Sequence, residues 1–224
     1  MSTRELTVVR PREPVAAGPA VGSTAWLEAA RRVLRLSWLS LAWMGAEGAI
    51  AIAAGILAGS IALIGFGVDS AIEGLASLII IWRFTGSRTL SHAAERRAQK
   101  LVAMQFFLLA PYVTAEALHK LVSGEHPSTS WLGIALTASS LIGMPFLGIA
   151  KRRLANQLGS VATHGEGTQN LFCAYLAGAV LVGLLGNALF GLWWLDPAAA
   201  LVIAGVAIKE GLESWRGEGC CATC

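Results

Sequence analysis

The chain of 224 residues is 55% hydrophobic and only 14% charged, and its mean hydropathy is +0.61. Soluble domains carry about a quarter charged residues, so this composition excludes a soluble globular protein and favours an integral membrane protein. The net charge of +3 gives no indication of a nucleic-acid partner, and its distribution along the chain is more informative.

The N-terminal region differs from the rest of the chain. Residues 1–24 contain three prolines and no apolar run, which predicts a disordered cytoplasmic arm and not a signal peptide. Residues 25–36 place apolar side chains such as Trp26 on one face and arginines on another, a pattern that predicts a short helix at the membrane interface. The transport domain is expected over residues 37–216, with a cysteine-containing tail over residues 217–224.

Six stretches are long and apolar enough for transmembrane helices, each of which needs about 20 residues. The predicted spans are residues 37–59, 61–84, 101–122, 131–150, 164–190 and 196–214. The expected fold is therefore an all-α integral membrane protein with six transmembrane helices.

Basic residues indicate the orientation of these spans. Sixteen of the seventeen Lys and Arg residues precede the first span, lie in or beside the second and fourth connections, or end the sixth span. The exception is Lys120. Because Lys and Arg are enriched in cytoplasmic loops, both termini are predicted to be cytoplasmic.

Five acidic residues fall inside the predicted spans: Glu47, Asp69, Glu73, Glu116 and Glu166. An ionised group at mid-membrane costs at least about 2.5 kcal/mol, and such groups often mark an ion path. No Lys or Arg is expected in the middle of any span, so these carboxylates need a proton or a metal cation as partner. Glu47 alone is equally explained as a hydrogen-bonding group between helices, and Glu116 lies near the outer end of its span, where its role is left open.

The spacing of these groups indicates a metal site. Asp69 and Glu73 are four residues apart and share a helix face, and Glu166 and Asn170 repeat this step on the fifth span. Two oxygen ligands from each of two helices make four, a number that suits a divalent cation such as zinc. At 1.5 Å rise per residue, all four groups are expected about 12 to 21 Å above the cytoplasmic boundary.

Other candidate ligands lie apart from these four. Glu47 and His164 are candidates for an additional metal or proton site, although His164 is about 200° around the helix from Glu166. Three thiols in the C-terminal tail fit the capture of a soft metal, and an unstructured terminus explains them equally well. These thiols belong to Cys220, Cys221 and Cys224.

Three of these segments resemble the cation diffusion facilitator family. They are the second-span run from Ser60 to Ser77, the fifth-span run from Gly159 to Asn170, and the sixth-span run from Trp193 to Ala204. The similarity covers about residues 35–216 and keeps the helix order. It implies that two ligands on the second helix and two on the fifth bind the transported ion, that proton exchange drives export, and that the protein is a homodimer.

Carried over residue by residue, the resemblance implies an ion site of Asp69, Glu73, Glu166 and Asn170. The sequence departs from the family pattern because this set contains no histidine, and an all-oxygen site leaves manganese and iron open beside zinc. Only eight residues follow Arg216, whereas the family usually carries a large cytoplasmic C-terminal domain. The closer resemblance is therefore to the compact, transmembrane-163-like branch.

The expected function is proton-coupled export of divalent metal cations, Zn²⁺ foremost, from the cytoplasm by alternating access. The alternatives are an exporter of Mn²⁺ or Fe²⁺, a proton-coupled exporter of organic cations, and a membrane metal sensor without flux. An enzyme is not expected, because the sequence contains no H-E-x-x-H motif. The metal is expected as substrate and not as cofactor, with protons, lipid and a second copy as partners and no nucleic acid. An Arg-rich and Ala-rich composition is typical of a bacterial inner membrane.

Overall fold

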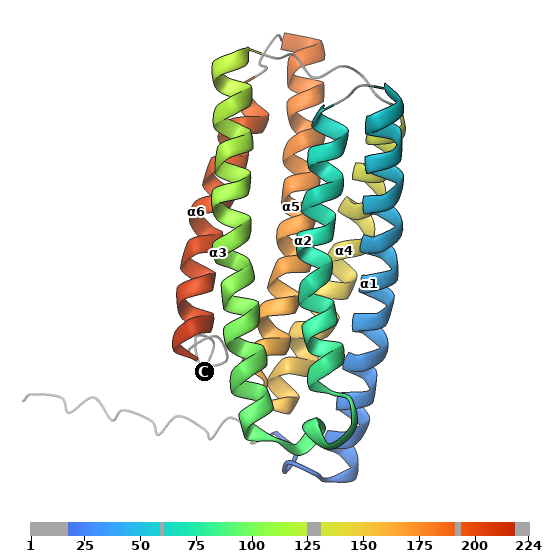
Figure 1. Ribbon diagram of the computed structural model, residues 1–224, viewed down its shortest axis with the longest axis vertical. Helices are drawn as coiled ribbons and strands as arrows, with labels where there is room; N and C mark the ends of the chain where they lie inside the picture. Colours follow the sequence, from blue (N-terminus) through green and yellow to red (C-terminus); the bar gives the residue numbers. More distant parts are fainter. Residues whose placement is uncertain (1–17, 59–60, 125–130, 191–193, 218–224) are drawn as a thin grey trace, which may run out of the picture.

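The computed structural model describes residues 18–58, 61–124, 131–190 and 194–217, and these residues contain six α-helices, one short 3₁₀ helix and no strand. Figure 1 shows the six helices aligned as a bundle. The all-helical class is therefore confirmed. The elements are α1 Thr24–Ala58, α2 Ile61–Arg83, η1 Gly86–Leu90, α3 His92–Ser123, α4 Trp131–Leu158, α5 Val161–Phe190 and α6 Leu195–Arg216.

The N-terminal helix corrects one expectation. Residues 25–36 are the first part of a continuous α1 and not a separate interfacial helix. Their apolar face packs against the bundle, because Trp26 is 3% exposed and its indole nitrogen donates a hydrogen bond to the backbone oxygen of Leu158 at 3.3 Å. The predicted disordered arm lies outside the described residues up to residue 17, and the cysteine tail lies outside them from residue 218.

The connection between α4 and α5 is shorter than expected. α4 continues to Leu158, eight residues beyond the predicted span end, and α5 begins at Val161. Gly159 ends α4 with a φ of +62°, a left-handed conformation that glycine adopts without strain. Ser160 then caps α5, since its hydroxyl oxygen accepts a hydrogen bond from the Thr163 backbone nitrogen at 3.1 Å.

Two helix crossings repeat along the chain. α1 crosses α2 at Gly48 and Gly67, and 100 residues later α4 crosses α5 at Gly148 and Gly167. A Cβ atom on Gly67 would lie 2.8 Å from the Gly48 carbonyl oxygen, and one on Gly167 would lie 2.9 Å from that of Gly148. Only glycine allows this approach. Because α1 and α4 run in opposite directions (Figure 1), the two halves form an inverted repeat, with α3 packed along α6.

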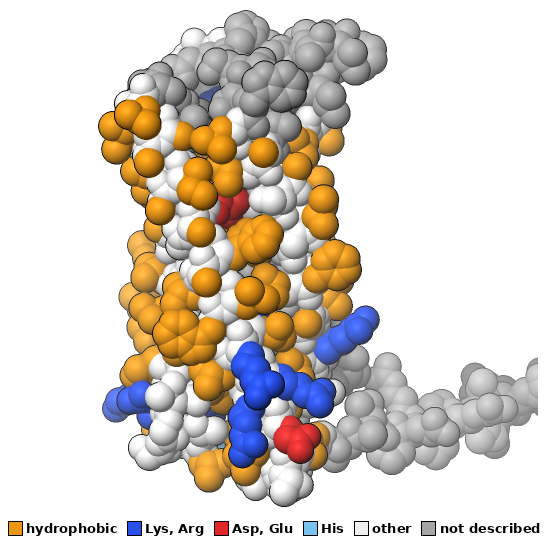
Figure 2. Space-filling model, turned by 90° about the vertical axis from the view of Figure 1, so that its right-hand side faces the viewer, with side chains coloured by type: hydrophobic (Ala, Val, Ile, Leu, Met, Phe, Trp, Pro, Cys, Tyr) orange, Lys and Arg blue, Asp and Glu red, His pale blue; other side chains and the backbone are white. Residues whose placement is uncertain are grey.

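One end of the bundle, which we call the basic end, carries most of the basic side chains. α1 begins and α6 ends there, and Figure 2 shows Lys and Arg gathered toward it. Arg83 Nε donates to Glu95 Oε2 at 2.7 Å, and Glu95 Oε1 accepts from the Ala162 backbone nitrogen at 3.2 Å. Glu95 therefore joins α2, α3 and α5 at this end. The other basic residues of the basic end include Arg88, Arg152, Arg153 and Arg216.

Large apolar side chains cover the outside of the bundle. Phe146, Val202 and Ile142 are 73%, 68% and 66% exposed, and apolar side chains extend over most of the face in Figure 2. Lipid-facing helices present such a surface, whereas soluble monomers rarely do. By length and composition, α3 and the Thr24–Ala54 part of α1 can cross a membrane, in a search limited to the described residues. Six spans and their orientation stay a prediction.

Candidate functional site

Asp69 and Glu73 lie on the buried face of α2. Their exposed fractions are 9% and 4%, and their four-residue spacing places them one turn apart. Oδ1 of Asp69 and both carboxylate oxygens of Glu73 accept no hydrogen bond from an N–H or O–H group of the residues that the structure describes. Burial of a carboxylate without a partner is costly, and a bound cation or proton relieves that cost. This pair is the strongest candidate for a cation site.

Cys173 approaches this pair from α5. It is 4% exposed, and its thiol interacts with the carboxyl group of Glu73. The sequence predicted no role for this residue beyond packing, because a single cysteine in an apolar run resembles any small buried side chain. The only signal in the sequence is its position one turn after Asn170, on the helix that carries the other predicted ligands.

Glu47 is a third carboxylate in the same part of the bundle. It is 3% exposed on α1 and accepts hydrogen bonds from Ser140 of α4 and, at 3.5 Å, from Ser70 of α2. It also lies near enough to repel the charge of Asp69. The structure therefore gives Glu47 the hydrogen bonds between helices that were one of its two interpretations, and it places this side chain beside the α2 pair.

Glu166 and Asn170 lie on α5 next to a buried lysine. Lys151 Nζ donates to Glu166 Oε1 at 2.7 Å and to Asn170 Oδ1 at 2.9 Å. The side chains of Lys151 and Glu166 are 0% and 1% exposed. The expectation that no lysine neutralises the intramembrane carboxylates is wrong, because α4 continues past residue 150 and turns Lys151 into the bundle.

The remaining polar atoms of Glu166 and Asn170 also have partners. Ser37 Oγ donates to Glu166 Oε2 at 2.8 Å, and Asn170 Nδ2 lies 3.3 Å from Met144 Sδ. In the part of the chain that is described, no three His, Cys, Asp or Glu side chains are grouped closely enough to hold a metal ion. The four predicted ligands thus do not meet at one point in this conformation, and their joint site stays a prediction.

The other candidates lie apart from these clusters. His164 is 8% exposed, and its Nε2 accepts a hydrogen bond from Arg152 Nε at 3.2 Å, a cationic neighbour that disfavours a metal ion. Glu116 forms an ion pair with Lys120 at 3.2 Å on the same helix. The tail thiols of Cys220, Cys221 and Cys224 lie outside the described residues.

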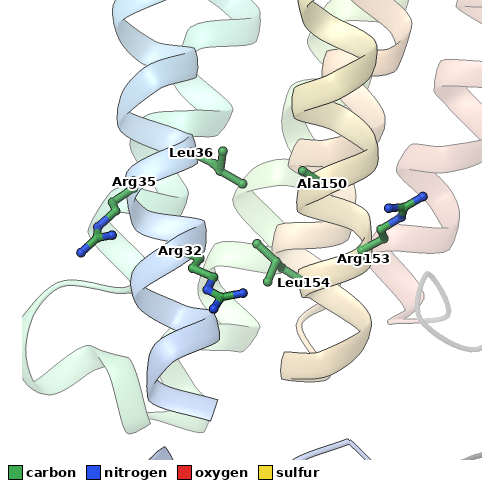
Figure 3. Close-up of a pocket in the computed structure, with 6 residues that line it drawn as sticks. All are labelled: Arg32, Arg35, Leu36, Ala150, Arg153 and Leu154. Carbon is green, nitrogen blue, oxygen red and sulfur yellow. The ribbon is translucent and has the colours of Figure 1, made fainter. Parts of the chain in front are cut away.

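An open groove between α1 and α4 lies at the basic end. Its volume is about 440 Å³, and Leu36, Ala150 and Leu154 line it together with three arginines. Figure 3 shows Arg32 directed toward α4, while the guanidinium groups of the other two, on α1 and α4, point away from the groove. Positive charge along an opening repels an approaching metal cation, so this groove is not a suitable entry for one.

Comparison with known proteins connects this architecture to a family. Residues 37–216 match the family described as cation efflux transmembrane domain. The chain belongs to the cation efflux family. It is also 23% identical over 186 residues to Transmembrane protein 163 of Xenopus laevis, a match that covers 82% of this chain and 66% of that protein. The chain thus spans slightly less than two thirds of the relative's length.

Membership in this family confirms the resemblance found in the sequence, including the transmembrane-163-like branch. It identifies a membrane protein of the cation efflux family. The relative comes from a frog, so it lends no support to a bacterial inner membrane. Zinc specificity, proton coupling and the homodimer stay predictions.

Proposed function

We propose that this cation efflux protein exports divalent metal cations, Zn²⁺ foremost, in exchange for protons. Six spans would cross the membrane with the basic end in the cytoplasm, as the positive-inside rule predicts. One observation carries the proposal: Asp69 and Glu73 are buried one turn apart on α2, and three of their four carboxylate oxygens accept no hydrogen bond from an N–H or O–H group of the described residues.

The proposed ligands are Asp69 and Glu73 from α2, joined by Glu166 and Asn170 from α5 in the cation-loaded conformation. The described conformation supports the α2 half, where oxygen atoms lack partners. In the α5 half the Lys151 ammonium holds the same oxygens that a metal ion would take. Loading of the full site therefore requires the ammonium and the two α5 oxygens to separate.

Proton exchange follows from the chemistry of the α2 pair. Two neighbouring buried carboxylates repel each other, so a proton or a cation stabilises them, and the two compete for the same oxygens. Export results when the cation binds from the cytoplasm and protons displace it on the other side. The inverted repeat of α1–α3 and α4–α6 supports alternating access, since rocking of one half against the other is typical of such repeats.

The choice of zinc over manganese rests on Cys173. Its thiol lies beside Glu73, so a sulfur donor is within reach of the proposed ion, although all four predicted ligands carry oxygen. Zinc accepts thiolate and oxygen ligands together, whereas Mn²⁺ prefers oxygen alone. The thiol thus shifts the preference of a carboxylate site toward zinc.

The test is Zn²⁺ flux into proteoliposomes under an imposed pH gradient, with Mn²⁺ and Fe²⁺ as competitors. We expect Asp69→Asn and Glu73→Gln to lower the flux at least about tenfold, the effect of about 1.4 kcal/mol. Glu213→Gln is the matched control, because that carboxylate pairs with Lys209 at 3.5 Å near the end of α6. Zn²⁺ binding without flux in the unaltered protein would indicate a sensor, and flux that survives both α2 changes would refute the site.

A further inference from the structure

Lys151 is a buried lysine whose ammonium group donates three hydrogen bonds. Its Nζ donates to Ser40 Oγ of α1 at 2.6 Å, to Glu166 Oε1 at 2.7 Å and to Asn170 Oδ1 at 2.9 Å. An ammonium carries three N–H donors, so all three are used. The side chain is 0% exposed, and loading of the proposed site requires its ammonium group to leave the two α5 oxygens.

The three acceptors around Lys151 form a cage of oxygen atoms. A carboxylate, a side-chain amide and a hydroxyl are ligands that hard divalent cations take from proteins. The second oxygen of Glu166 is fixed by Ser37, so the oxygen that faces Lys151 has a set position. The cage is therefore a site for a positive charge, and the Lys151 ammonium of the same chain occupies it.

We infer that the Lys151 ammonium is a tethered stand-in for the transported cation. It fills the cage of Ser40, Glu166 and Asn170 while no metal is bound there, and a divalent cation takes Glu166 and Asn170 only when the ammonium leaves. The inference rests on the proposed function, and it adds the group that competes with the substrate inside the protein.

Lys151 lies close enough to the basic end for its ammonium group to reach the lipid headgroups or water there. Lys151 lies seven residues before the end of α4, which is about 10 Å from the basic end. Long lysine side chains can keep their stem in apolar surroundings while the charged head reaches water or lipid headgroups. Away from the basic end, the ammonium faces the proposed ion site. Asn170, which it bonds, is one turn from Cys173 on α5, and Cys173 contacts Glu73.

The charges also favour exchange over joint occupancy. A divalent ion on the Glu166 and Asn170 oxygens would lie directly beside the buried ammonium, and two cations at that distance repel each other strongly in a low-dielectric interior. If the ammonium moves out, Glu166 becomes free for the incoming ion together with Asp69 and Glu73. A tethered competitor lowers the apparent affinity of the substrate by the fraction of time that it leaves the site open.

Chemical labelling of the unaltered protein tests the exchange. The full chain in detergent micelles is treated with N-hydroxysuccinimide acetate, with and without Zn²⁺, and acetylation of each lysine is measured by mass spectrometry. We expect Zn²⁺ to raise the acetylation of Lys151 several-fold. Lys209, whose side chain is 73% exposed, is the internal reference and should not change.

A separate titration of Zn²⁺ binding, by calorimetry on the same sample, distinguishes two kinds of failure. Protein that binds Zn²⁺ while Lys151 stays protected would overturn the tethered-cation inference and leave the proposed transport function standing. Protein that binds no Zn²⁺, Mn²⁺ or Fe²⁺ would overturn the proposed function, and the inference with it.

Variants give a second measurement. Lys151→Gln should bind Zn²⁺ at least about tenfold more tightly, because the competing ammonium is gone. Lys151→Gln combined with Glu166→Gln should lose this gain, and Lys209→Gln should have none. An unchanged Kd in Lys151→Gln, or a gain that persists in the double variant, would contradict the inference. If Lys151→Gln alone does not fold, the labelling result decides the question.

Discussion

Removal of one partner from the Lys151–Glu166 pair should destabilise the protein strongly. Glu166→Gln leaves an ammonium that is 0% exposed without its counter-charge, and no solvent is available to screen it. The cost of breaking a buried pair in this way is about 3 to 5 kcal/mol. For a chain of this size, 1 kcal/mol lowers the Tm by about 2 to 4 °C, so we expect a decrease of about 6 to 20 °C.

The measurement is thermal unfolding in detergent micelles, with helical circular dichroism as the readout. Glu213→Gln is the control, because its partner Lys209 is 73% exposed and a solvated pair of this kind contributes at most about 1 kcal/mol. Lys151→Met combined with Glu166→Gln should recover most of the loss, since no unpaired charge then remains buried. Equal shifts for Glu166→Gln and Glu213→Gln would refute the reasoning, because the lysine would then be solvated.

Three further predictions concern packing, selectivity and coupling. Gly148→Ala should lower the free energy of unfolding by about 1 to 3 kcal/mol, because its Cβ would lie 2.8 Å from the Gly167 carbonyl oxygen. Gly45→Ala, with no atom within 4 Å of the added Cβ, should not destabilise the protein, and thermal unfolding compares the two variants. Cys173→Ser should reduce the preference for Zn²⁺ over Mn²⁺ in competition flux, because a hydroxyl replaces the thiol beside Glu73; an unchanged ratio would exclude the thiol as a ligand. Zn²⁺ flux should fall to the level of empty liposomes when an ionophore removes the pH gradient, and flux that continues would exclude proton coupling.

The order of the helices and most of their ends followed from hydropathy and from the positions of basic residues. The start of α3 did not, because His92 lies nine residues before the predicted span. The end of α4 did not, because hydropathy falls at Lys151 although the helix continues to Leu158. Helix ends depend on backbone capping, here the left-handed Gly159, more than on polarity. The buried residues Met144, Leu147 and Lys151 follow a helical period of three to four residues, and that period was the available signal for an inward-facing lysine.

The candidate site could be predicted only one helix at a time. The four-residue steps correctly placed both members of each pair inside the bundle, with exposed fractions between 1% and 9% for Asp69, Glu73, Glu166 and Asn170. The partners of these groups, such as Ser37, come from other helices. Their identity depends on how each helix is rotated against its neighbours, and a single sequence does not specify that rotation.

Among the hydrogen bonds that join the halves of the inverted repeat, two link α1 to α4 through buried charged side chains at different depths. Lys151 of α4 bonds Ser40 of α1, and Glu47 of α1 bonds Ser140 of α4. Counted along each helix from the basic end, Lys151 is seven residues in and Ser140 is eighteen. The α2 pair falls between these depths, with Glu73 at ten residues and Asp69 at fourteen.

This placement of the two bonds constrains how the halves can move. Rocking of one half against the other opens one end of the bundle while the other end stays closed, so it has to break one of these bonds and can keep the second. The Lys151–Ser40 bond is the one nearer the basic end, and departure of the ammonium would weaken the closure there, to which the Trp26–Leu158 and Ser37–Glu166 bonds also contribute. A cation that takes the Glu166 and Asn170 oxygens would therefore displace the ammonium and weaken the closure of the basic end in the same event, which couples occupancy of the site to access from that end.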